Sequence, residues 1–308
     1  MNRDDTNERT IFHYIDQLQD RISSTLEKID GAARFQVDNW ERPGGGGGQS
    51  RILENGAVFE KGGVNVSKVY GQLPEPMKAY LKIEQGDFFA CGISLVIHPK
   101  SPLVPTVHAN FRYFELYDNN NKVVDQWFGG GIDLTPYYLF DEDVVHFHQQ
   151  CKSVCDAHDP RFYQTFKDKC DRYFWNTHRN EARGVGGLFF DYCRSSDERS
   201  IEQWYDFVTA TGDAFLGCYT PIVAKRKDLP FSSEQRNWQV LRRGRYVEFN
   251  LIHDKGTLFG LKTQGRIESI LMSLPPTVQW KYNVSPAPGS EEERLVRILE
   301  KPINWIKQ

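Results

Sequence analysis

Polar side chains recur at alternate positions in an otherwise apolar stretch between residues 92 and 138. His108, Asn110 and Arg112 are spaced i, i+2 and i+4, so on a β-strand their side chains share one face. The preceding run repeats this alternation with Ser94 and His98. A polar strand face opposite an apolar one is either a solvated sheet surface or the lining of a pocket. The choice between these two interpretations decides what chemistry the stretch can do.

Arginines stand in or beside several apolar, strand-like segments, namely Arg112, Arg183, Arg242, Arg243, Arg245 and Arg266. A buried arginine needs an anionic partner. One interpretation supplies that partner within the protein, from Asp133, Asp191, Glu248 or Asp254. The other is a ligand with several carboxylates, because a guanidinium binds a carboxylate through two parallel hydrogen bonds.

Four histidines, His98, His108, His148 and His178, fall in four different predicted elements. If three of them converged, they would suit an iron or copper ion. A metal site usually adds a carboxylate at a recognisable spacing, and the sequence shows no such pattern. We therefore favour acid–base chemistry for these side chains, the commonest use of histidine near neutral pH.

Two glycine runs, Gly44–Gly48 and Gly129–Gly131, invite comparison with nucleotide-binding loops. The first lacks the following Lys-Ser/Thr pair, and the second lacks the third glycine that opens a helix. Neither run therefore predicts a nucleotide site. We expect residues 44–48 to form a mobile loop, because glycine restricts the backbone least, and we expect this loop to act as a lid carrying Arg51.

The composition is that of a globular protein with a substantial core. The chain has 308 residues, 39% of them hydrophobic, and a net charge of −3, which argues against a nucleic-acid partner. No apolar run approaches the roughly 20 residues of a membrane span. The six cysteines are scattered without a CxxC pair, and residues 1–10 resemble neither a signal nor a transit peptide. These features predict a cytoplasmic protein with reduced, buried thiols.

The elements that must position these residues follow from periodicity and turn signals. We expect helices over 11–29, 141–158, 160–181, 199–218 and 232–242, a short helix over 265–276, and a last helix opening at Ser290. We expect hairpins within 51–70, strands over 91–98, 106–116, 123–128 and 184–192, and a long hairpin over 245–263 that turns at Asp254. Because antiparallel strands and helices are segregated, the chain predicts an α+β fold, with a large antiparallel sheet flanked by helices on both faces in a single domain over residues 1–308.

Six long segments resemble, in the same order, those of the oxygen-dependent coproporphyrinogen III oxidase family. They are GISLVIHP, PTVHANFRYF, WFGGGIDLTPYY, HRNEARGVGGLFFDY, RRGRYVEFNLIHDKGTLFGLKTQGR and ESILMSLPP. The resemblance extends from the N-terminal helix almost to the C-terminus. It implies oxidative decarboxylation of two propionates of coproporphyrinogen III to vinyl groups, with O2 as oxidant and protoporphyrinogen IX as product, in haem biosynthesis.

The resemblance also implies roles for individual residues. His108 matches a proposed proton donor, and Asp254 matches an aspartate proposed to hold or deprotonate the pyrrole NH groups. The positions that match substrate contacts are Ser94, Asn110, Phe111, Arg112, Gln264, Gly265 and Arg266. The positions that match histidines once assigned to a metal are His98, His108, His148 and His178. A segment from about Tyr246 to Tyr282 matches the part that forms a homodimer.

The implied reaction requires no cofactor besides O2, because an electron-rich pyrrole can supply its own electrons. The alternatives that stay open are an oxygenase that depends on a divalent metal and a tetrapyrrole carrier without catalysis. One departure from the family pattern is visible, since the usual Asp-Arg-Gly is Asp254-Lys255-Gly256 here. Lysine keeps the positive charge of arginine but loses the fork that grips a carboxylate.

Overall fold

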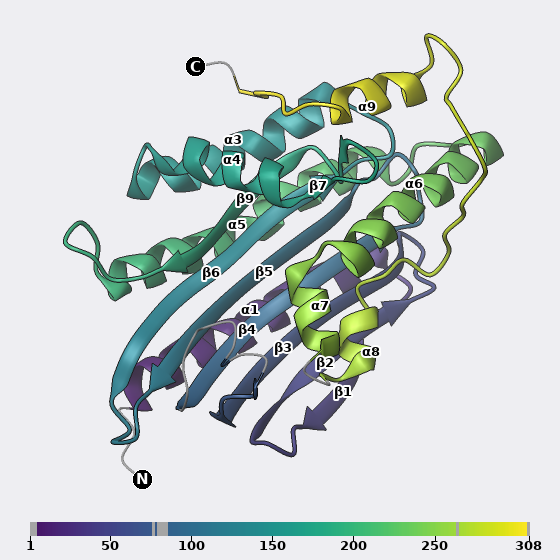
Figure 1. Ribbon diagram of the computed structural model, residues 1–308. Coiled ribbons are helices and arrows are strands. Elements are labelled where there is room, and N and C mark those ends of the chain that lie inside the picture. The colour runs from purple at the N-terminus through teal and green to yellow at the C-terminus, as the bar shows by residue number, and fades with distance from the viewer. Residues whose placement is uncertain (1–4, 76–77, 79–85, 263–264, 307–308) are drawn as a thin grey trace.

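A twisted antiparallel sheet forms the centre of the molecule (Figure 1). The structure is a computed structural model that describes residues 5–75, 78, 86–262 and 265–306. The sheet has seven strands, and every neighbouring pair is antiparallel. In spatial order the strands are β1 (Gln36–Glu41), β2 (Gly46–Glu54), β3 (Phe59–Gln72), β4 (Asp87–Pro99), β5 (Thr106–Tyr117), β6 (Val123–Thr135) and β9 (Gly186–Cys193).

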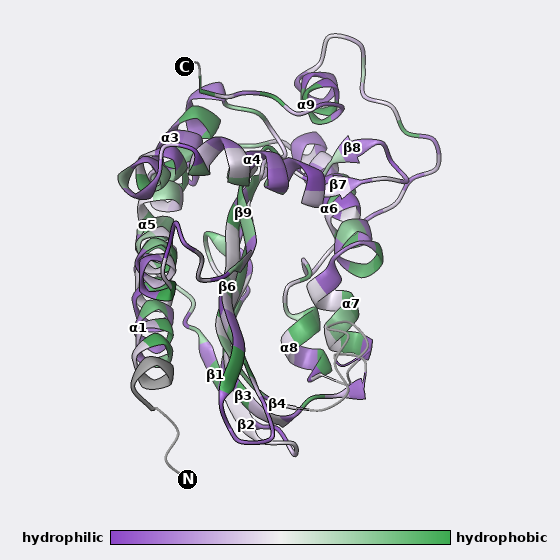
Figure 2. Cartoon of the chain, turned by 60° about the vertical axis from the view of Figure 1, so that its left-hand side comes forward, coloured by the Kyte–Doolittle hydropathy of each residue, from purple (hydrophilic) through white to green (hydrophobic). Residues whose placement is uncertain are grey.

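Helices cover both faces of this sheet, as Figure 2 shows with the sheet seen nearly edge-on. One layer contains α1 (Asp5–Asp30), α3 (Asp141–His158) and α5 (Ile201–Arg226). The other contains α6 (Ser233–Ile252), α7 (Lys255–Lys262) and α8 (Ile267–Leu271). The remaining elements are α4 (Phe162–Tyr173), α9 (Glu291–Leu299) and the short strand pair β7 (Trp175–Asn176) and β8 (Glu181–Ala182). The predicted α+β fold with helices on both faces is confirmed.

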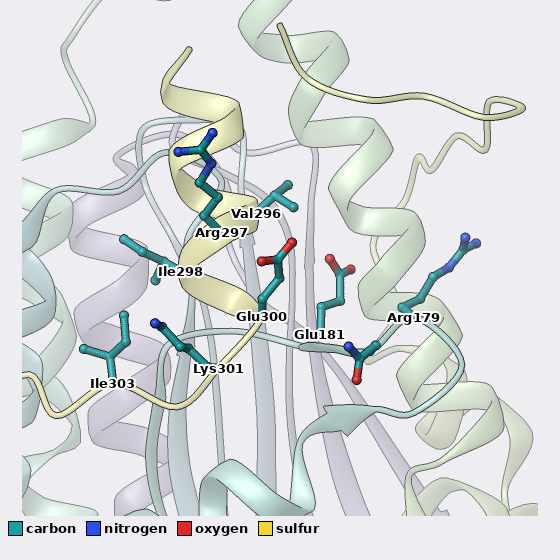
Figure 3. A pocket seen from close by; sticks show the side chains of 9 residues that line it. Arg179, Glu181, Val296, Arg297, Ile298, Glu300, Lys301 and Ile303 are labelled. Carbon is teal, nitrogen blue, oxygen red and sulfur yellow. The ribbon is translucent and has the colours of Figure 1, made fainter. Parts of the chain in front are cut away.

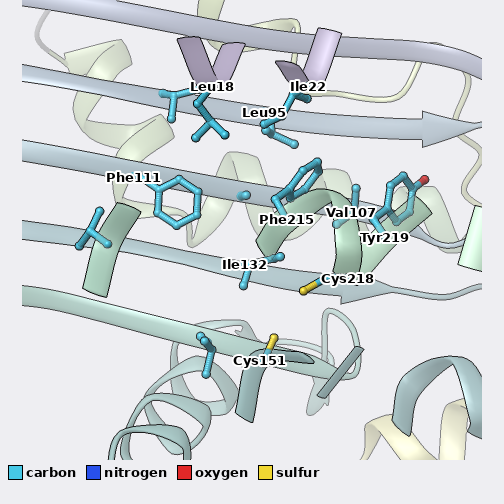
Figure 4. Packing of buried hydrophobic residues seen from close by; sticks show 14 of the residues in the cluster. Leu18, Ile22, Leu95, Val107, Phe111, Ile132, Cys151, Phe215, Cys218 and Tyr219 are labelled. Atoms are coloured by element: carbon cyan, nitrogen blue, oxygen red, sulfur yellow. The ribbon is translucent and has the colours of Figure 1, made fainter. Parts of the chain in front are cut away.

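The main hydrophobic core lies between the sheet and the layer of α1 and α5 (Figure 4). From α1 the apolar residues at three- and four-residue spacing, such as Leu18 and Ile22, meet Leu95 of β4 and Phe111 of β5. Phe215 of α5 joins the same cluster. Every second side chain of β4 and β5 is thereby buried, which leaves the alternate side chains for the opposite face.

The first glycine run is not a mobile loop, and that prediction is wrong. Gly46, Gly47 and Gly48 open β2 and pair with β3, and Gly47 and Gly48 also pair with β1. Gly45 ends the turn before the strand and Gly46 begins the strand, with φ of +114° and +84°, values that favour glycine. A Cβ at Gly48 would lie 2.3 Å from the ring of Trp40, so glycine is required there by close packing.

The lid hypothesis for Arg51 is wrong for a related reason. Arg51 lies inside β2 and pairs in register with Val64, a core residue, so its side chain faces the α1 layer. There its guanidinium forms an ion pair with Asp20 of α1. The side chain of Arg51 thus packs on the core face of the sheet, against α1. It does not cover the opposite face.

The predicted hairpin over residues 245–263 is also wrong. Residues up to Ile252 continue α6, and α7 begins at Lys255. Tyr246, Val247 and Phe249 favour strands by propensity, but in α6 they lie on the buried side of the helix. Tertiary packing therefore overrides the local preference. The turn expected at Asp254 exists, but it joins two helices instead of two strands.

Candidate active site

The face of the sheet opposite the main core carries unusually small side chains across four adjacent strands. Residues paired directly across antiparallel strands point to the same face. One such row runs Gly48, Ser67, Gly92 and Arg112, and the next runs Ser50, Asn65, Ser94 and Asn110. We call these eight residues the floor. All except Arg112 are glycine, serine or asparagine. Ser50 is buried against Ser269 of α8 and Gly48 lies against the ring of Trp40, so a ligand can approach the strand backbones closely over β3 to β5.

The floor is open to solvent at the middle of the sheet. Ser94 stands on β4, the fourth of the seven strands, and is nevertheless exposed. Gly92, Asn110 and Arg112 around it are half-buried. An exposed side chain on a central strand means that α6, α7 and α8 leave this part of the sheet uncovered. The polar strand face is thus an open surface at the middle of the sheet, with half-buried neighbours around Ser94.

A guanidinium stands at each side of the floor. Arg112 donates to Asn110 Oδ1 at 2.7 Å and forms a 3.0 Å ion pair with Asp191 of β9. Arg266, just before α8, pairs with Asp38 of β1 and donates to Ser269 Oγ at 3.2 Å. Asp38 lies in the same register row as Asn110, four strands away, which corresponds to roughly 19 Å at the usual strand spacing. The two cations can therefore bind only separate anionic groups of one broad ligand.

His108 is oriented by a buried carboxylate. Its Nδ1 lies 2.7 Å from Asp133 Oδ1, and the other oxygen of Asp133 accepts from Arg183 at 2.7 Å. A carboxylate only accepts, so Nδ1 carries the proton, and Nε2 lies 3.4 Å from Asn110 Nδ2 of the floor. Burial would raise the pKa of Asp133, but the nearby Arg183 and His108 outweigh burial and lower it. The carboxylate is thus ionised and holds the imidazole in one tautomer.

Arg183 is enclosed by aromatic rings beneath α6. Its guanidinium carbon lies 4.0 Å from the ring centre of Phe174 and 4.9 Å from that of Phe249. Burial opposes its charge, yet Asp133 and other anions nearby raise its pKa. Arg183 also donates to Asn250 Oδ1 of α6 at 2.9 Å, which ties this helix to the site.

Asp254 lies between α6 and α7, over the side of the sheet formed by β6 and β9. Its Oδ1 accepts from Thr257 N at 2.7 Å and so caps α7, and its Oδ2 accepts from the Tyr173 hydroxyl at 3.0 Å. The ring of Tyr173 stacks on Phe189 of β9 at 4.1 Å. Phe189 pairs with Gly131, the next residue along the floor row of Asn110. A residue far along the chain is thereby placed beside the floor.

The other predicted substrate contacts divide into three cases. The side chain of Phe111 packs in the core on the far face, so it supports the floor from behind (Figure 4). Gly265 adjoins Arg266 and its N–H donates to Gly260 O at 2.8 Å. Gln264 lies outside the described residues.

The four histidines that match a former metal assignment lie in separate environments. His98 is buried, with its ring nitrogens 3.2 Å from Thr106 Oγ1 and 2.8 Å from Ser273 O. His148 is buried on α3, in the opposite helical layer, and bonds to Tyr163 and Val185. His178 bonds to His253 and Glu248, and His108 bonds to Asp133. Among the residues that the structure describes, no group of three histidine, cysteine or carboxylate side chains has the arrangement of a metal site.

Ion pairs within the protein account for the buried and half-buried arginines away from the floor. Arg243 pairs with Glu60 at 2.7 Å, and Arg242 pairs with Glu181 at 3.1 Å. Arg245 pairs with Glu248 at 3.1 Å. These three arginines are therefore structural, whereas Arg112 and Arg266 border the open floor.

A cavity of about 770 Å³ lies elsewhere, between α9 and the β7–β8 pair (Figure 3). Its lining mixes apolar side chains such as Ile298 with charged ones such as Glu300 and Lys301. It shares no residue with the floor. The candidate site is a broad open surface on the sheet instead of an enclosed cavity.

Comparison with known proteins agrees with the resemblance seen in the sequence. The family model described as coproporphyrinogen III oxidase matches residues 10–305. The chain belongs to this family. It is 51% identical over 302 residues to a protein of Glycine max named oxygen-dependent coproporphyrinogen-III oxidase, chloroplastic, covering 95% of this chain and 78% of the relative. A protein of the same name from Nicotiana tabacum is 50% identical over 301 residues, covering 94% of this chain and 75% of the relative.

The structure adds residues to this coproporphyrinogen oxidase site that the sequence indicated only as ion-pair partners or not at all. Asp133 and Asp191 were expected only to neutralise arginines, and they prove to orient His108 and Arg112. Tyr173 and Asp38 carried no signal in the chain. Once β5 and β6 are placed in register, however, His108 pairs with Asp133, so a correct strand alignment could have found this contact.

The remaining sequence predictions can be compared with the same structure. All six cysteines are free and buried, as expected. Among the described helices, none is long and apolar enough to cross a membrane.

Proposed function

We propose that this protein catalyses the oxidative decarboxylation of two propionates of coproporphyrinogen III to vinyl groups, with O2 as oxidant and protoporphyrinogen IX as product. The observation that carries the proposal is the floor, whose small side chains lie between Arg112 and Arg266. A tetrapyrrole macrocycle is broad and apolar and bears carboxylates on its rim. Such a ligand suits a flat surface bordered by two separated guanidinium groups.

The macrocycle also needs an acceptor for its pyrrole N–H groups. Asp254 supplies a partly exposed carboxylate beside the floor. Two of its acceptor positions are taken by Thr257 and Tyr173. Because a carboxylate accepts about four hydrogen bonds, roughly two positions remain for the N–H groups of the ligand. Acceptance of these bonds increases electron density on the pyrrole, which favours its reaction with O2.

Each propionate loses carbon dioxide and one hydrogen from its β-carbon. Two electrons pass to O2, and with a second proton the oxygen leaves as hydrogen peroxide. His108 is the nearest described imidazole to the floor, and its Nε2 is the nitrogen not bound to Asp133. We assign it the transfer of a proton during this step. Arg112 and Arg266 hold the carboxylates so that the reacting side chain keeps its position.

Electrons in this scheme come from the substrate itself, so we propose that no cofactor besides O2 is required. The competing hypothesis is an oxygenase that depends on a divalent metal. Metal analysis of the active enzyme distinguishes them. Stoichiometric iron or copper, with activity lost on its removal and restored on its return, would contradict the cofactor-free proposal.

The function itself is tested with anaerobically prepared coproporphyrinogen III. Enzyme and substrate are mixed with and without O2, and the products are oxidised and identified by porphyrin fluorescence. We expect the protoporphyrin product only in the sample that contains O2. Tight binding of porphyrinogen without oxygen uptake would indicate a carrier and would overturn the assignment.

We also propose that the protein is a homodimer through the segment Tyr246–Tyr282. Large apolar side chains are exposed in this segment, including Ile252 at 53%, Ile267 at 56% and Trp280 at 51%. Several large exposed apolar side chains within one segment support an interface there.

The dimer proposal has a matched test. Val37 on β1 is exposed to a similar degree, at 56%, but lies outside the segment. Ile252→Asp should give a monomer in sedimentation velocity, whereas Val37→Asp should leave the dimer intact. A wild-type protein that sediments as a monomer at micromolar concentration would overturn this proposal.

A cytoplasmic location, predicted from the sequence, stays a prediction. Both plant relatives are named chloroplastic. Cell fractionation followed by immunodetection decides between these locations.

A further inference from the structure

Tyr173 connects three parts of the molecule at the edge of the floor. It is the last residue of α4, and its ring stacks on Phe189 of β9 with an interplanar angle of 14°. The same ring packs edge-on against Phe174 and Phe249, at 4.9 and 6.0 Å between centres. These contacts fix the ring from three sides. The position of its hydroxyl group is therefore set by the sheet and by α6, independently of α7.

The hydroxyl of Tyr173 bonds in two directions at once. Its oxygen accepts from the backbone N–H of Lys255 at 3.2 Å, and its proton is donated to Asp254 Oδ2 at 3.0 Å. The direction of the second bond follows because an ionised carboxylate can only accept. Burial and the adjacent Asp254 both raise the pKa of Tyr173, so the hydroxyl keeps its proton.

Among the described residues, the carboxylate of Asp254 has one other hydrogen-bond partner, at the end of its own helix. Thr257 N donates to Oδ1, but this bond moves with α7 and does not relate the carboxylate to the sheet. The charged groups nearest to this pair from other elements are already engaged, since Arg183 binds Asp133 and Asn250, and Arg112 binds Asp191 and Asn110. On the same segment, the His253 ring bonds to His178. Tyr173 is thus the described side chain that ties the carboxylate of Asp254 to the floor.

We infer that Tyr173 is a positioning residue, whose hydroxyl orients the carboxylate of Asp254 so that one free acceptor position on each oxygen faces the pyrrole N–H groups of the substrate. This inference rests on the proposed function. Without the hydroxyl, the carboxylate can rotate and the turn before α7 loses its anchor at Lys255. The substrate carboxylates would still be gripped by Arg112 and Arg266, so binding would weaken without being abolished.

The test is a double-mutant cycle on substrate affinity, measured anaerobically so that inactive variants can be included. Tyr173→Phe keeps the stacked ring and removes only the hydroxyl. In the background with Asp254 present, we expect about tenfold weaker binding of coproporphyrinogen III, the usual worth of a hydrogen bond to a charged group. In the Asp254→Asn background, the same change should alter binding less than twofold.

Tyr163→Phe is the matched control. Tyr163 lies on the same helix and bonds to His148, away from the floor, so its variant should change affinity in neither background. Equal effects of Tyr173→Phe in both backgrounds would overturn the inference and indicate a purely structural role. If Asp254→Asn alone changes neither affinity nor turnover, the failure lies instead with the role proposed for Asp254.

Discussion

The two faces of β4 and β5 differ sharply although they alternate residue by residue along the same strands. On one face, Leu95 and Phe111 are almost completely buried against α1 and α5. On the other, Ser94 is exposed and Asn110 is half-buried beside Gly131 of β6. The same backbone therefore serves as the wall of a core and as the floor of a site.

This difference shows where stability and function are separated in the fold. Large side chains on the core face supply the burial that holds the sheet together, at about 25 cal/mol per Å² of apolar surface. The opposite face can then carry small and polar residues without loss of the fold. Substitutions on the two faces should accordingly affect different measurements.

The largest effect is expected at Asp254, beside the open face. Asp254→Asn should lower kcat by about a thousandfold, because the variant cannot accept the pyrrole N–H bonds as an anion or take up a proton. Thermal unfolding and the sedimentation coefficient should stay close to those of the wild type. Near-normal turnover would contradict the role of the carboxylate.

The next largest effect is the pH dependence of stability that we expect from the buried His148 of α3. Burial lowers the pKa of His148 to about 4, from an ordinary 6.5. Between these values the unfolded chain binds a proton that the folded protein does not, so stability is complete above about pH 6.5 and falls as the pH approaches 4. The full loss is about 3 kcal/mol.

Urea unfolding of the wild type and of His148→Gln across pH 7 to 4 measures this contribution of His148 to the free energy of unfolding. The variant should be less stable at pH 7, but its stability should fall less steeply with pH. If the two proteins show the same slope, His148 is not the group responsible. Turnover per folded molecule should be equal in both at pH 7.

Ser94→Phe should weaken substrate binding by about a hundredfold, because the ring would occupy the space above the central strand. Stability should change by no more than about 0.5 kcal/mol, since Ser94 is exposed. Anaerobic titration with coproporphyrinogen III measures the affinity, and urea unfolding measures the stability.

The adjacent residue provides the control for this comparison. Leu95→Ala should lower the free energy of unfolding by about 2–5 kcal/mol through the cavity it leaves. Its affinity for the substrate at low temperature should stay near the wild-type value. Loss of affinity in Leu95→Ala and retention in Ser94→Phe would reverse the assignment of the two faces.

The smallest effect is expected at Lys255, where the family usually has arginine. Lys255 is exposed and adjoins Asp254. Lys255→Arg should lower KM by about threefold, because the guanidinium can bind a propionate through two bonds. An unchanged KM would show that this side chain does not reach the substrate.

Much of this arrangement follows from sequence periodicity. The alternation of His108, Asn110 and Arg112 predicts one polar face, and the structure shows these residues on one face. The sequence alone could not show that Ser94 is exposed, because exposure depends on how far α6 to α8 stand from the sheet. Asp133 was likewise hidden, since its contact with His108 depends on the register of β5 and β6.

The helix expected over 160–181 ends at Tyr173 and is followed by the β7–β8 pair. Two other wrong elements have clear physical causes. Gly44–Gly48 was interpreted as mobile because glycine has the greatest freedom, but pairing on both sides and the ring of Trp40 hold the strand. The C-terminal half of α6 was interpreted as a strand because Tyr246, Val247 and Phe249 favour strands. Burial of these residues beneath the helix outweighs that preference.

The most direct test of the floor uses a thiol placed at its centre. All six natural cysteines are buried, so they should react slowly with a thiol reagent, whereas Ser94→Cys places a thiol at an exposed position. Labelling is followed anaerobically with and without saturating coproporphyrinogen III, and Val37→Cys on exposed β1 is the control. We predict that substrate slows labelling at position 94 by at least about tenfold, as expected for a site that is occupied most of the time, and leaves position 37 unchanged. An equal labelling rate at position 94 with and without bound substrate would contradict the claim that this face of the sheet holds the tetrapyrrole.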